Sequence, residues 1–329
     1  MKILITGAFG NLGTQILNLL KNTEHEVRCF STKSRRAKKV ARKYKQRFEI
    51  FYGDIRNFDD VVKAVKDQDI VIHLAAIVPP KFNHISLDYS REVNVCGTDN
   101  VVQAIKQSEQ KTKIIFASSV AVFGDVRRRG ACVLASDEPP NPNADDIYAQ
   151  QKVLAEEIIL KAPIQWSIFR FGFMLNIDNL KMDPMMFEVP LDTNMEIIHL
   201  RDAAYAVVQA LEKEEIWQKI MLVAGGEDCR LTYKEFVSTM LNTMGVGELP
   251  EEAFTKNDFH CAFMDTTESQ ELLKYQRSSF DDTILEMKQK TKVLRFFAIL
   301  FRPIAKSFIL SQSRYYQHWK RSRRRRKSI

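Results

Sequence analysis

The sequence predicts an α/β protein with a doubly wound parallel sheet, a small C-terminal lobe and a basic C-terminal tail. Three observations support this prediction. A short apolar strand, a glycine-rich turn and a helix start fill the first 20 residues. Apolar runs with strand character then alternate with helical patterns as far as residue 171, and no acidic residue follows Glu286. Such alternation is typical of a parallel sheet with crossover helices on both faces.

The glycine turn is the most informative segment. Residues 2–5 read KILI, and TGAFGNLG runs from Thr6 to Gly13 before an apolar-periodic stretch. Gly7, Gly10 and Gly13 permit a tight turn, let backbone approach a pyrophosphate and let the helix pack against the strand. The helix start then offers free N–H groups and a positive dipole end to that phosphate. The segment therefore predicts the opening of a Rossmann-type sheet.

The remaining elements follow in order. We expect strands at residues 2–5, 26–30, 48–52, 69–75, 113–117 and 165–171, and helices at 12–22, 34–45, 58–67, 87–108 and 146–161. A later helix at 199–212 and a strand at 220–223 return to the sheet, because the same rhythm resumes there.

This rhythm also predicts the domains. The Rossmann domain comprises residues 1–171 with 199–225 returning to it. Residues 172–198 lack the alternation and contain two prolines, so together with 226–290 they form the predicted substrate-binding lobe. Residues 291–329 form a basic amphipathic tail.

Composition limits the setting of the protein. The 329 residues are 45% apolar, enough for a large core. The five cysteines are widely spaced without a CxxC pair, so we expect no disulfide framework and no metal site. This predicts a reducing, cytoplasmic location. The N-terminal apolar run stops after four residues and no run approaches the ~20 residues of a membrane span, so we expect neither a signal peptide nor a transmembrane helix.

A candidate for proton transfer lies in the segment YAQQK. Tyr148 and Lys152 stand four residues apart, so a helix places both on one face. A neighbouring ammonium favours the phenolate that a tyrosine acid/base needs. Ser119 ends the upstream strand at the carboxyl edge of the sheet, where open α/β folds bind ligands, and could hydrogen-bond a substrate carbonyl. Ser118 fits a capping role better.

At this point the sequence resembles an extended short-chain dehydrogenase/reductase of the NAD-dependent epimerase/dehydratase family. The matching segments keep the family order: TGAFGNLG at 6–13, GDIRN at 53–57, HLAA at 73–76, NVCGT at 94–98, SSVAVFG at 118–124, YAQQK at 148–152 and IHLRDAA at 198–204. The resemblance implies that Ser119, Tyr148 and Lys152 form the catalytic triad.

The resemblance also implies a set of cofactor contacts. Asp54 would meet the adenine through its side chain and Ile55 through its backbone, Ala75 would line the cofactor path, and Tyr148 and Lys152 would meet the nicotinamide end. The same comparison adds further positions in the glycine turn, after the fourth strand and in the NVCGT segment: Phe9, Asn11, Leu12, Leu74, Ala76 and Asn94.

The choice of cofactor depends on the end of the second strand. An acidic residue there would bind the ribose 2′-hydroxyl of NAD, but none occurs between Glu26 and Glu49. The segment offers hydroxyls and cations suited to a 2′-phosphate, with Ser31, Lys33, Arg35 and Arg36 as candidate ligands. The prediction is NADP, with NAD as the alternative, because these cations also suit a solvated helix start.

Departures from the family pattern narrow the substrate. Phe173 stands where sugar-nucleotide epimerases carry an asparagine, and Met195 where they carry an arginine that grips the diphosphate. Val120 and Ala121 replace the Asp-Glu pair of the dehydratase branch. These changes favour an apolar ketone or alcohol as the small-molecule substrate.

Three functional hypotheses remain. The first is an NADP-dependent oxidoreductase with tyrosine as general acid/base. The second is an epimerase that retains NAD, and the third is a non-catalytic dinucleotide-sensing scaffold, which the intact triad disfavours. The family commonly dimerises through two helices, and those at 87–108 and 146–161 are the candidates for a homodimer.

The tail has its own predicted partner. Residues 287–329 hold 14 of the 49 Lys and Arg, which leaves 35 basic against 41 acidic residues elsewhere. Large apolar residues alternate with cations at 291–310, and arginines cluster at 323–326. This predicts peripheral attachment to the anionic inner face of a membrane, and the apolar content disfavours nucleic acid. The alternative is that 291–310 pack as a closing helix on the protein.

Overall fold

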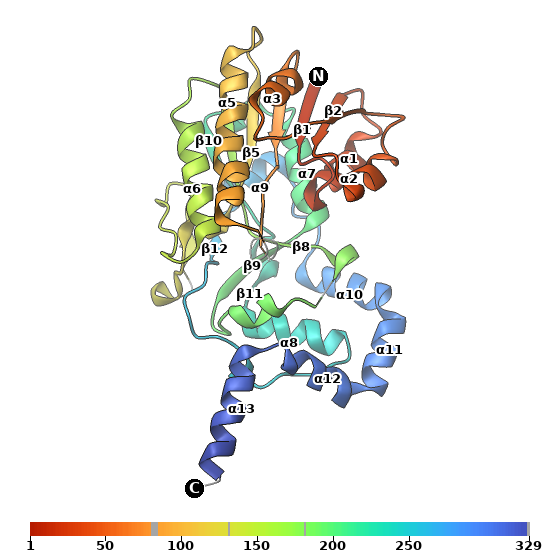
Figure 1. The fold of residues 1–329 in the computed structure, drawn as a ribbon, viewed down its shortest axis with the longest axis vertical. Helices are drawn as coiled ribbons and strands as arrows, with labels where there is room; N and C mark the ends of the chain where they lie inside the picture. The colour runs from red at the N-terminus through yellow and green to blue at the C-terminus, as the bar shows by residue number, and fades with distance from the viewer. Residues whose placement is uncertain (80–84, 131, 181, 328–329) are drawn as a thin grey trace.

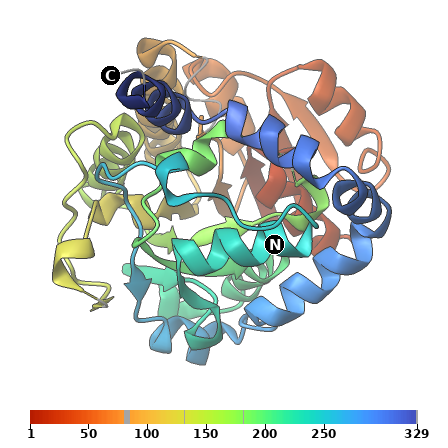
Figure 2. The same cartoon turned by 90° about the horizontal axis from the view of Figure 1, so that it is seen from below.

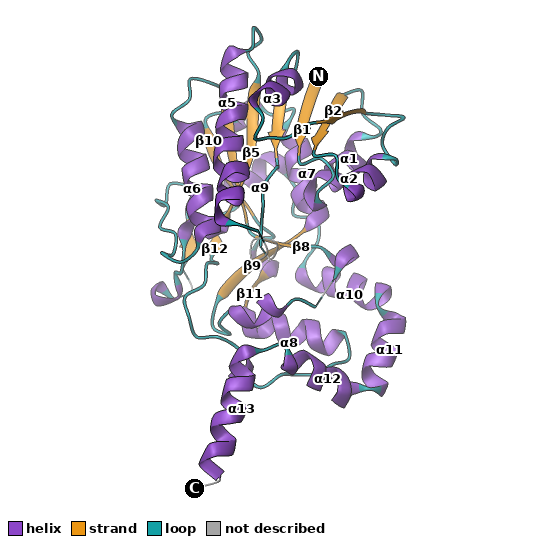
Figure 3. Ribbon diagram, viewed as in Figure 1, coloured by secondary structure: helices purple, strands orange, loops and turns teal. Residues whose placement is uncertain are grey.

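The computed structural model describes residues 1–79, 85–130, 132–180 and 182–327, the last three without their side chains. Its centre is a seven-stranded sheet in the order β10-β7-β5-β4-β1-β2-β3 (Figures 1 and 3). The strands are β1 (Lys2–Thr6), β2 (Glu26–Ser31), β3 (Glu49–Tyr52), β4 (Ile70–His73), β5 (Lys113–Ser119), β7 (Trp166–Phe171) and β10 (Lys219–Val223). Every neighbouring pair is parallel. The predicted doubly wound sheet is confirmed.

Helices cover both faces of this sheet, each over its own apolar cluster. One face carries α1 (Asn11–Leu20), α2 (Arg35–Ala41) and α7 (Leu200–Ala210). The other carries α3 (Phe58–Val65), α5 (Gly97–Gln107) and α6 (Ile147–Leu160). Polar side chains begin several of them: Ser34 caps α2, Asn57 caps α3 and Asp146 caps α6, each accepting a backbone N–H.

The helix expected at 87–108 is interrupted in register. It consists of α4 (Leu87–Arg91), a π-helical turn η2 (Glu92–Cys96) and α5. Asn94 lies in the π turn, where its amide bonds both main-chain groups of Ile77 and the side chain of Gln151 on α6. A π turn is the geometry that inserts one extra residue into a helix, and here it ties the loop after β4 to the helix of the YAQQK segment.

The lobe below the sheet is built from non-consecutive segments. Its small sheet has the order β11-β9-β8, with β8 (Phe173–Leu175), β9 (Asn194–His199) and β11 (Arg230–Thr232). A second pairing joins β6 (Val133–Leu134) to β12 (Phe263–Met264), so part of the 120–145 excursion lies with the lobe. The helices α8 (Tyr233–Thr243) and α10 (Phe280–Lys290) pack in the lobe. In contrast, α9 (Thr267–Leu273) packs against β10 and α7 at the main sheet.

The predicted tail is helical. It forms α11 (Lys292–Leu300), α12 (Arg302–Ser311) and α13 (Arg314–Lys327), which follow α10 around the edge of the lobe (Figure 2). The tail touches the lobe at Gly245 through α11 and Arg302, but it buries side chains in the lobe core only at the end of α12, at Ile309 and Leu310. No residue of α11 is buried. Residues 328–329 and the side chains of Arg325 and Arg326 in the predicted cluster lie outside the described residues.

A buried ion pair fixes α6 to the sheet. Glu156 accepts two hydrogen bonds from the guanidinium of Arg170 on β7, at 3.1 and 2.8 Å, and a third from the hydroxyl of Ser118 on β5. Glu156 and Arg170 are each 1% exposed. Burying both charges is tolerated because nearly every polar atom of the pair is hydrogen-bonded, Arg170 also donating to the Glu138 carbonyl.

Glu156→Gln tests this anchor. It leaves the Arg170 guanidinium buried without a counter-charge, so we expect the free energy of unfolding to fall by about 3 to 5 kcal/mol. The neighbouring Glu157 is half-exposed and pairs with Lys161 on the surface, so Glu157→Gln is the matched control, with an expected loss under about 1 kcal/mol. Urea unfolding of both variants measures the difference, and equal losses would contradict a special role for the buried pair.

Candidate active site

The glycine turn has the geometry of a phosphate cradle. Gly7 has φ +66°, and a Cβ there would lie 2.9 Å from the backbone nitrogen of Ala75. A Cβ on Gly13 would lie 2.5 Å from the Ala8 carbonyl oxygen. Any side chain at either position would therefore force the turn open. Gly10 caps α1 without a side-chain hydrogen bond, which leaves N–H groups of the first turn available to a ligand.

Two of the other predicted residues in the turn face the core. Phe9 and Leu12 are buried, so only their backbone can contact a ligand. Asn11 is exposed, and its side chain accepts a hydrogen bond from Arg36 at 3.3 Å. This contact brings the start of α2 beside the glycine turn.

The predicted 2′-phosphate ligands lie at one place. Ser31 ends β2, and Ser34 caps α2 three residues later, so Lys33, Arg35 and Arg36 stand exposed at the helix start. Of these, Lys33 lies over the Tyr52 ring at 6.0 Å. The cluster of cations at the end of the second strand, predicted from sequence, is thus present beside the cradle.

Asp54 and Ile55 follow β3 at the same edge. The Asp54 carboxylate is held by Arg56 at 2.7 Å, and this hydrogen bond lowers the pKa of Asp54 despite partial burial. Arg56 also pairs with Glu92 on η2. Ile55 is buried, and its carbonyl accepts from Asn100 on α5. Asp54 is therefore ionised and fixed in place.

Residues after β4 are oriented by a buried hydroxyl. The Thr6 hydroxyl oxygen accepts from the backbone N–H groups of Leu74 and Ala75, each at 3.1 Å, and contacts His73 at 2.7 Å. Burial and then the charge of Lys152 lower the pKa of His73 to about 3, so this imidazole is neutral. Ala76 continues the same loop, and Asn94 clamps it through Ile77, so the side chain of Asn94 is already fully used.

The three predicted catalytic side chains come together. Ser119 ends β5, and its hydroxyl is hydrogen-bonded to the side chain of Tyr148 in the first turn of α6. Lys152 lies one turn further along α6 and is 5% exposed. Its ammonium donates to the Ala117 carbonyl oxygen at 2.6 Å and lies 4.6 Å from the Phe116 ring. Ser118 points instead to Glu156, in agreement with a structural role.

Burial sets the electrostatics of this triad. Burial raises the pKa of Tyr148 to about 12, with the charge of Asp146 acting in the same direction and the Ser119 hydrogen bond opposing it. Burial lowers the pKa of Lys152 to about 8, against the pull of Glu156. Both shifts favour the neutral forms, which is the expected result for ionisable groups withdrawn from water.

A neighbouring pair, Asp146 with His260, has no signature in the sequence. Asp146 hydrogen-bonds the Nδ1 atom of His260, which lies 114 residues away in the lobe and stacks on Phe259. Burial alone would raise the pKa of Asp146, but the hydrogen bond and charge of His260 leave it lowered. The pair joins the lobe to the first turn of α6, two residues before Tyr148. Helical spacing could have revealed Glu156, four residues after Lys152, but no local pattern predicts His260.

The two apolar departures occupy different environments. Phe173 on β8 is 39% exposed and meets Phe236 edge-on at 5.7 Å. Met195 on β9 is buried in the lobe core. Met195 therefore fills the core, and Phe173 is the position where an apolar side chain meets solvent.

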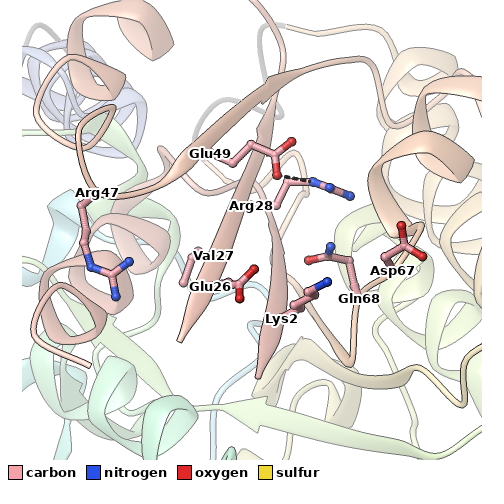
Figure 4. A pocket seen from close by; sticks show the side chains of 8 residues that line it. All are labelled: Lys2, Glu26, Val27, Arg28, Arg47, Glu49, Asp67 and Gln68. Atoms are coloured by element: carbon pink, nitrogen blue, oxygen red, sulfur yellow. Dashed lines mark hydrogen bonds and ion pairs between the residues drawn. The ribbon is translucent and has the colours of Figure 1, made fainter. Parts of the chain in front are cut away.

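A separate cavity of about 290 Å³ lies at the opposite, amino edge of β1 and β2 (Figure 4). Both arginines of this cavity already have partners: Arg28 pairs with Glu49 at 2.8 Å and bonds three carbonyls, and Arg47 bonds carbonyls near the end of α1. This mixed-charge cavity offers no phosphate cradle. Among the described residues there is no cluster of three or more His, Cys, Asp or Glu able to hold a metal ion.

Comparison with known proteins gives matches to the first half of the chain. Residues 4–167 match the 3-beta hydroxysteroid dehydrogenase/isomerase family. A 3-beta-hydroxysteroid dehydrogenase of Mycolicibacterium neoaurum is 30% identical over 165 residues, 48% of this chain and 42% of that protein. A CDP-paratose 2-epimerase of Salmonella typhi is 30% identical over 135 residues, 39% of each chain. The chain thus spans about two fifths of the length of these relatives.

Solved structures match almost the whole fold. A UDP-glucuronic acid 4-epimerase of Bacillus cereus, crystallised with NAD, has a TM-score of 0.72 at 22% identity and covers 89% of this chain and 100% of its own. DesIV, a dTDP-glucose 4,6-dehydratase of Streptomyces venezuelae crystallised with NAD, has a TM-score of 0.75 at 18% identity, covering 90% and 98%. Residues 4–167 therefore carry the sequence pattern of the 3-beta hydroxysteroid dehydrogenase/isomerase family. The solved structures, all under 25% identical, show that the chain has the fold of the extended short-chain dehydrogenase/reductases.

The buried Lys152 makes stability depend on pH. Its pKa is about 8 in the folded protein against 10.5 when unfolded, so the unfolded state binds more protons between these values. The cost of burying the ammonium, about 3 kcal/mol, is therefore fully present below pH 8 and is relieved as pH rises to 10.5.

The methionine in Lys152→Met has no charge to bury, so only the wild type gains free energy of unfolding as the pH rises. We expect the free energy of unfolding of the wild type to increase relative to that of Lys152→Met by about 3 kcal/mol between pH 8 and 10.5. Urea unfolding across that range measures the difference. Lys161→Met, at an exposed position of the same helix, is the control. A difference between wild type and Lys152→Met that does not change with pH would show that Lys152 keeps its ordinary pKa.

Proposed function

We propose that the protein is an NADP-dependent oxidoreductase that transfers a hydride between nicotinamide and a ketone or alcohol of an apolar substrate. The observation that carries the proposal is the hydrogen bond between Ser119 and Tyr148, with Lys152 one helical turn away. This arrangement of Ser119, Tyr148 and Lys152 serves proton transfer, which a scaffold that only senses dinucleotide does not carry out.

The side chains divide the chemistry between them. Ser119 holds the substrate carbonyl by a hydrogen bond, and Tyr148 gives its phenolic proton to the carbonyl oxygen during reduction or takes it back during oxidation. The Lys152 ammonium, one turn along the helix, favours the phenolate because an adjacent positive charge lowers a phenol's pKa. A bound nicotinamide dinucleotide would supply or accept the hydride.

The cofactor would lie across the glycine turn. Gly7, Gly10 and Gly13 provide the cradle for its pyrophosphate, and Asp54 and Ile55 border the place of the adenine. Lys33, Arg35 and Arg36 favour the 2′-phosphate of NADP, since guanidinium groups pair with phosphate through two parallel hydrogen bonds. An epimerase with retained NAD stays the second candidate, because solved structures of this fold include epimerases crystallised with NAD.

Substrate and surroundings follow from the lobe and the tail. Residues 172–198 and 226–290 form the proposed substrate lobe, and the exposed Phe173 supports an apolar substrate. We place the protein in the cytoplasm, with residues 291–329 in contact with an anionic membrane surface. A homodimer would form through α4–α5 and α6, where Leu87, Leu154 and Leu160 are exposed. No helix among the described residues is long and apolar enough to cross a membrane.

Tyr148→Phe tests the mechanism. The variant loses the proton donor but keeps the ring, so we expect turnover of hydrophobic carbonyls to fall by about 10²- to 10⁴-fold with dinucleotide affinity nearly unchanged. Steady-state kinetics and calorimetric titration measure the two effects. Tyr205→Phe, on the outer helix α7, is the matched control and should retain full activity. Wild-type turnover in Tyr148→Phe would rule out the assignment.

Arg35→Gln/Arg36→Gln tests the cofactor. Loss of two charge-assisted contacts to the 2′-phosphate should weaken NADPH binding by about tenfold or more and leave NADH binding unchanged. Lys38→Gln/Lys39→Gln, further along α2, controls for the general loss of positive charge. An absorbance scan of the purified protein checks for retained nicotinamide. Tightly held NAD, or equal NADPH binding in both double variants, would contradict the NADP proposal and favour the epimerase.

A further inference from the structure

Large exposed apolar side chains concentrate on two consecutive helices. Among the described residues, α11, α12 and the junction between them expose the set named here the α11–α12 patch: Val293, Leu294, Phe296, Phe297, Leu300, Phe301, Ile304 and Phe308. Val293 is 72% exposed and Ile304 is 68% exposed. Monomeric soluble proteins rarely expose so many large apolar side chains together, and such patches mark protein–protein or membrane interaction sites.

The patch faces away from the lobe because the opposite face of α11 packs against the lobe. Val293, Phe296, Phe297 and Leu300 recur at three- and four-residue steps, which places them on one face of α11. On the opposite side Ile299 and the Arg295 carbonyl approach Gly245 after α8, where a Cβ would lie 2.6 Å from Ile299 Cγ1 and 3.1 Å from the Arg295 oxygen.

The end of α12 fastens the patch to the lobe. Arg302 donates to the Gly245 carbonyl at 3.0 Å. Ile309 and Leu310 are buried in the lobe core, and the Ser313 hydroxyl donates to the Ala253 carbonyl at 2.6 Å. The α11–α12 patch is therefore a fixed part of the lobe surface, at the end of the molecule far from β1 and β2, while α13 projects from the body (Figures 1 and 2).

The charges around the patch identify the partner. Lys292, Arg295 and Lys306 lie among the apolar side chains, and α13 adds further cations. No acidic residue follows Glu286. A surface that presents anionic groups over an apolar interior satisfies both features, and this describes a bilayer with anionic lipids. A second copy of the patch would set cation against cation, and a nucleic acid would leave the phenylalanines in water.

We propose that the α11–α12 patch is an interfacial membrane-docking surface. Its apolar side chains enter the headgroup and acyl boundary of an anionic bilayer, and Lys292, Arg295 and Lys306 meet the lipid phosphates. The surface is separate from the arginine-rich α13, which supplies long-range attraction. The proposal rests on the membrane contact proposed above and assigns the substrate lobe a fixed position at the bilayer, next to apolar substrates dissolved there.

Vesicle co-sedimentation tests this surface without any need for turnover, so its outcome is independent of the oxidoreductase proposal. The full chain is mixed with phosphatidylcholine vesicles and with vesicles that contain about 30 mol% phosphatidylglycerol, enough anionic lipid for a strongly negative surface. Phe297→Ser/Ile304→Ser removes one exposed apolar group from each helix. Val133→Ser/Met182→Ser removes two similarly exposed groups elsewhere and is the matched control.

We expect the wild type and the control to bind the anionic vesicles and Phe297→Ser/Ile304→Ser to bind at least about tenfold more weakly. Thermal unfolding should not distinguish the variants, because both pairs lie at the surface. Equal binding by all three proteins that disappears in high salt would show adsorption through α13 alone and overturn the proposal. Vesicle-free self-association that Phe297→Ser/Ile304→Ser abolishes, without vesicle binding, would assign the patch to a second copy and also overturn it.

Discussion

The buried pair of Glu156 and Arg170 is the constraint on which the geometry of the proposed catalytic residues depends. It joins α6 to β7, and Ser118 adds β5, so the helix cannot rotate or slide without unpairing a charge in the core. Tyr148, Lys152 and Glu156 stand at four-residue steps on one face of α6, and a single anchor therefore orients both Tyr148 and Lys152. The neighbour of Ser118 on the same strand is Ser119, so the third member of the triad is fixed by the same contact.

This arrangement sets stability against chemistry. The helix α6 is held by the buried ion pair of Glu156 with Arg170. Burial of the same helix face lowers the pKa of Lys152 to about 8 and raises the pKa of Tyr148 to about 12. A core filled with apolar side chains would be less costly at these positions. The protein retains the ionisable groups, and the hydrogen bonds from Lys152 to the Ala117 carbonyl and from Arg170 to Glu156 offset the desolvation.

Local patterns predicted the sheet, the glycine turn and the triad because each depends on residues close together in the chain or on alternation along it. Gly7 and Tyr148 with Lys152 are such cases. Asp146 and His260 are 114 residues apart in the chain and meet only in the folded structure, so no local spacing of residues predicts their pairing. The π turn at Asn94 was missed because its extra residue leaves the apolar pattern of a helix unchanged. In the tail, the spacing of apolar residues is similar in α11 and α12. It could not predict that Ile309 and Leu310 are buried while α11 is exposed, because that depends on which residues reach the lobe core.

The family match covers the first half of the chain and leaves out most of the lobe. The match ends at residue 167, after the proposed triad and just inside β7, so the proposed catalytic residues lie within it and the proposed substrate lobe lies beyond it. What distinguishes this chain must therefore be sought in the lobe. There Met195 has become part of the core, Phe173 faces solvent, and the last turn of α12 closes the same apolar cluster. The proposed substrate lobe and the proposed membrane-docking surface thus share one apolar core, and we expect a change in the packing of that core to alter both together.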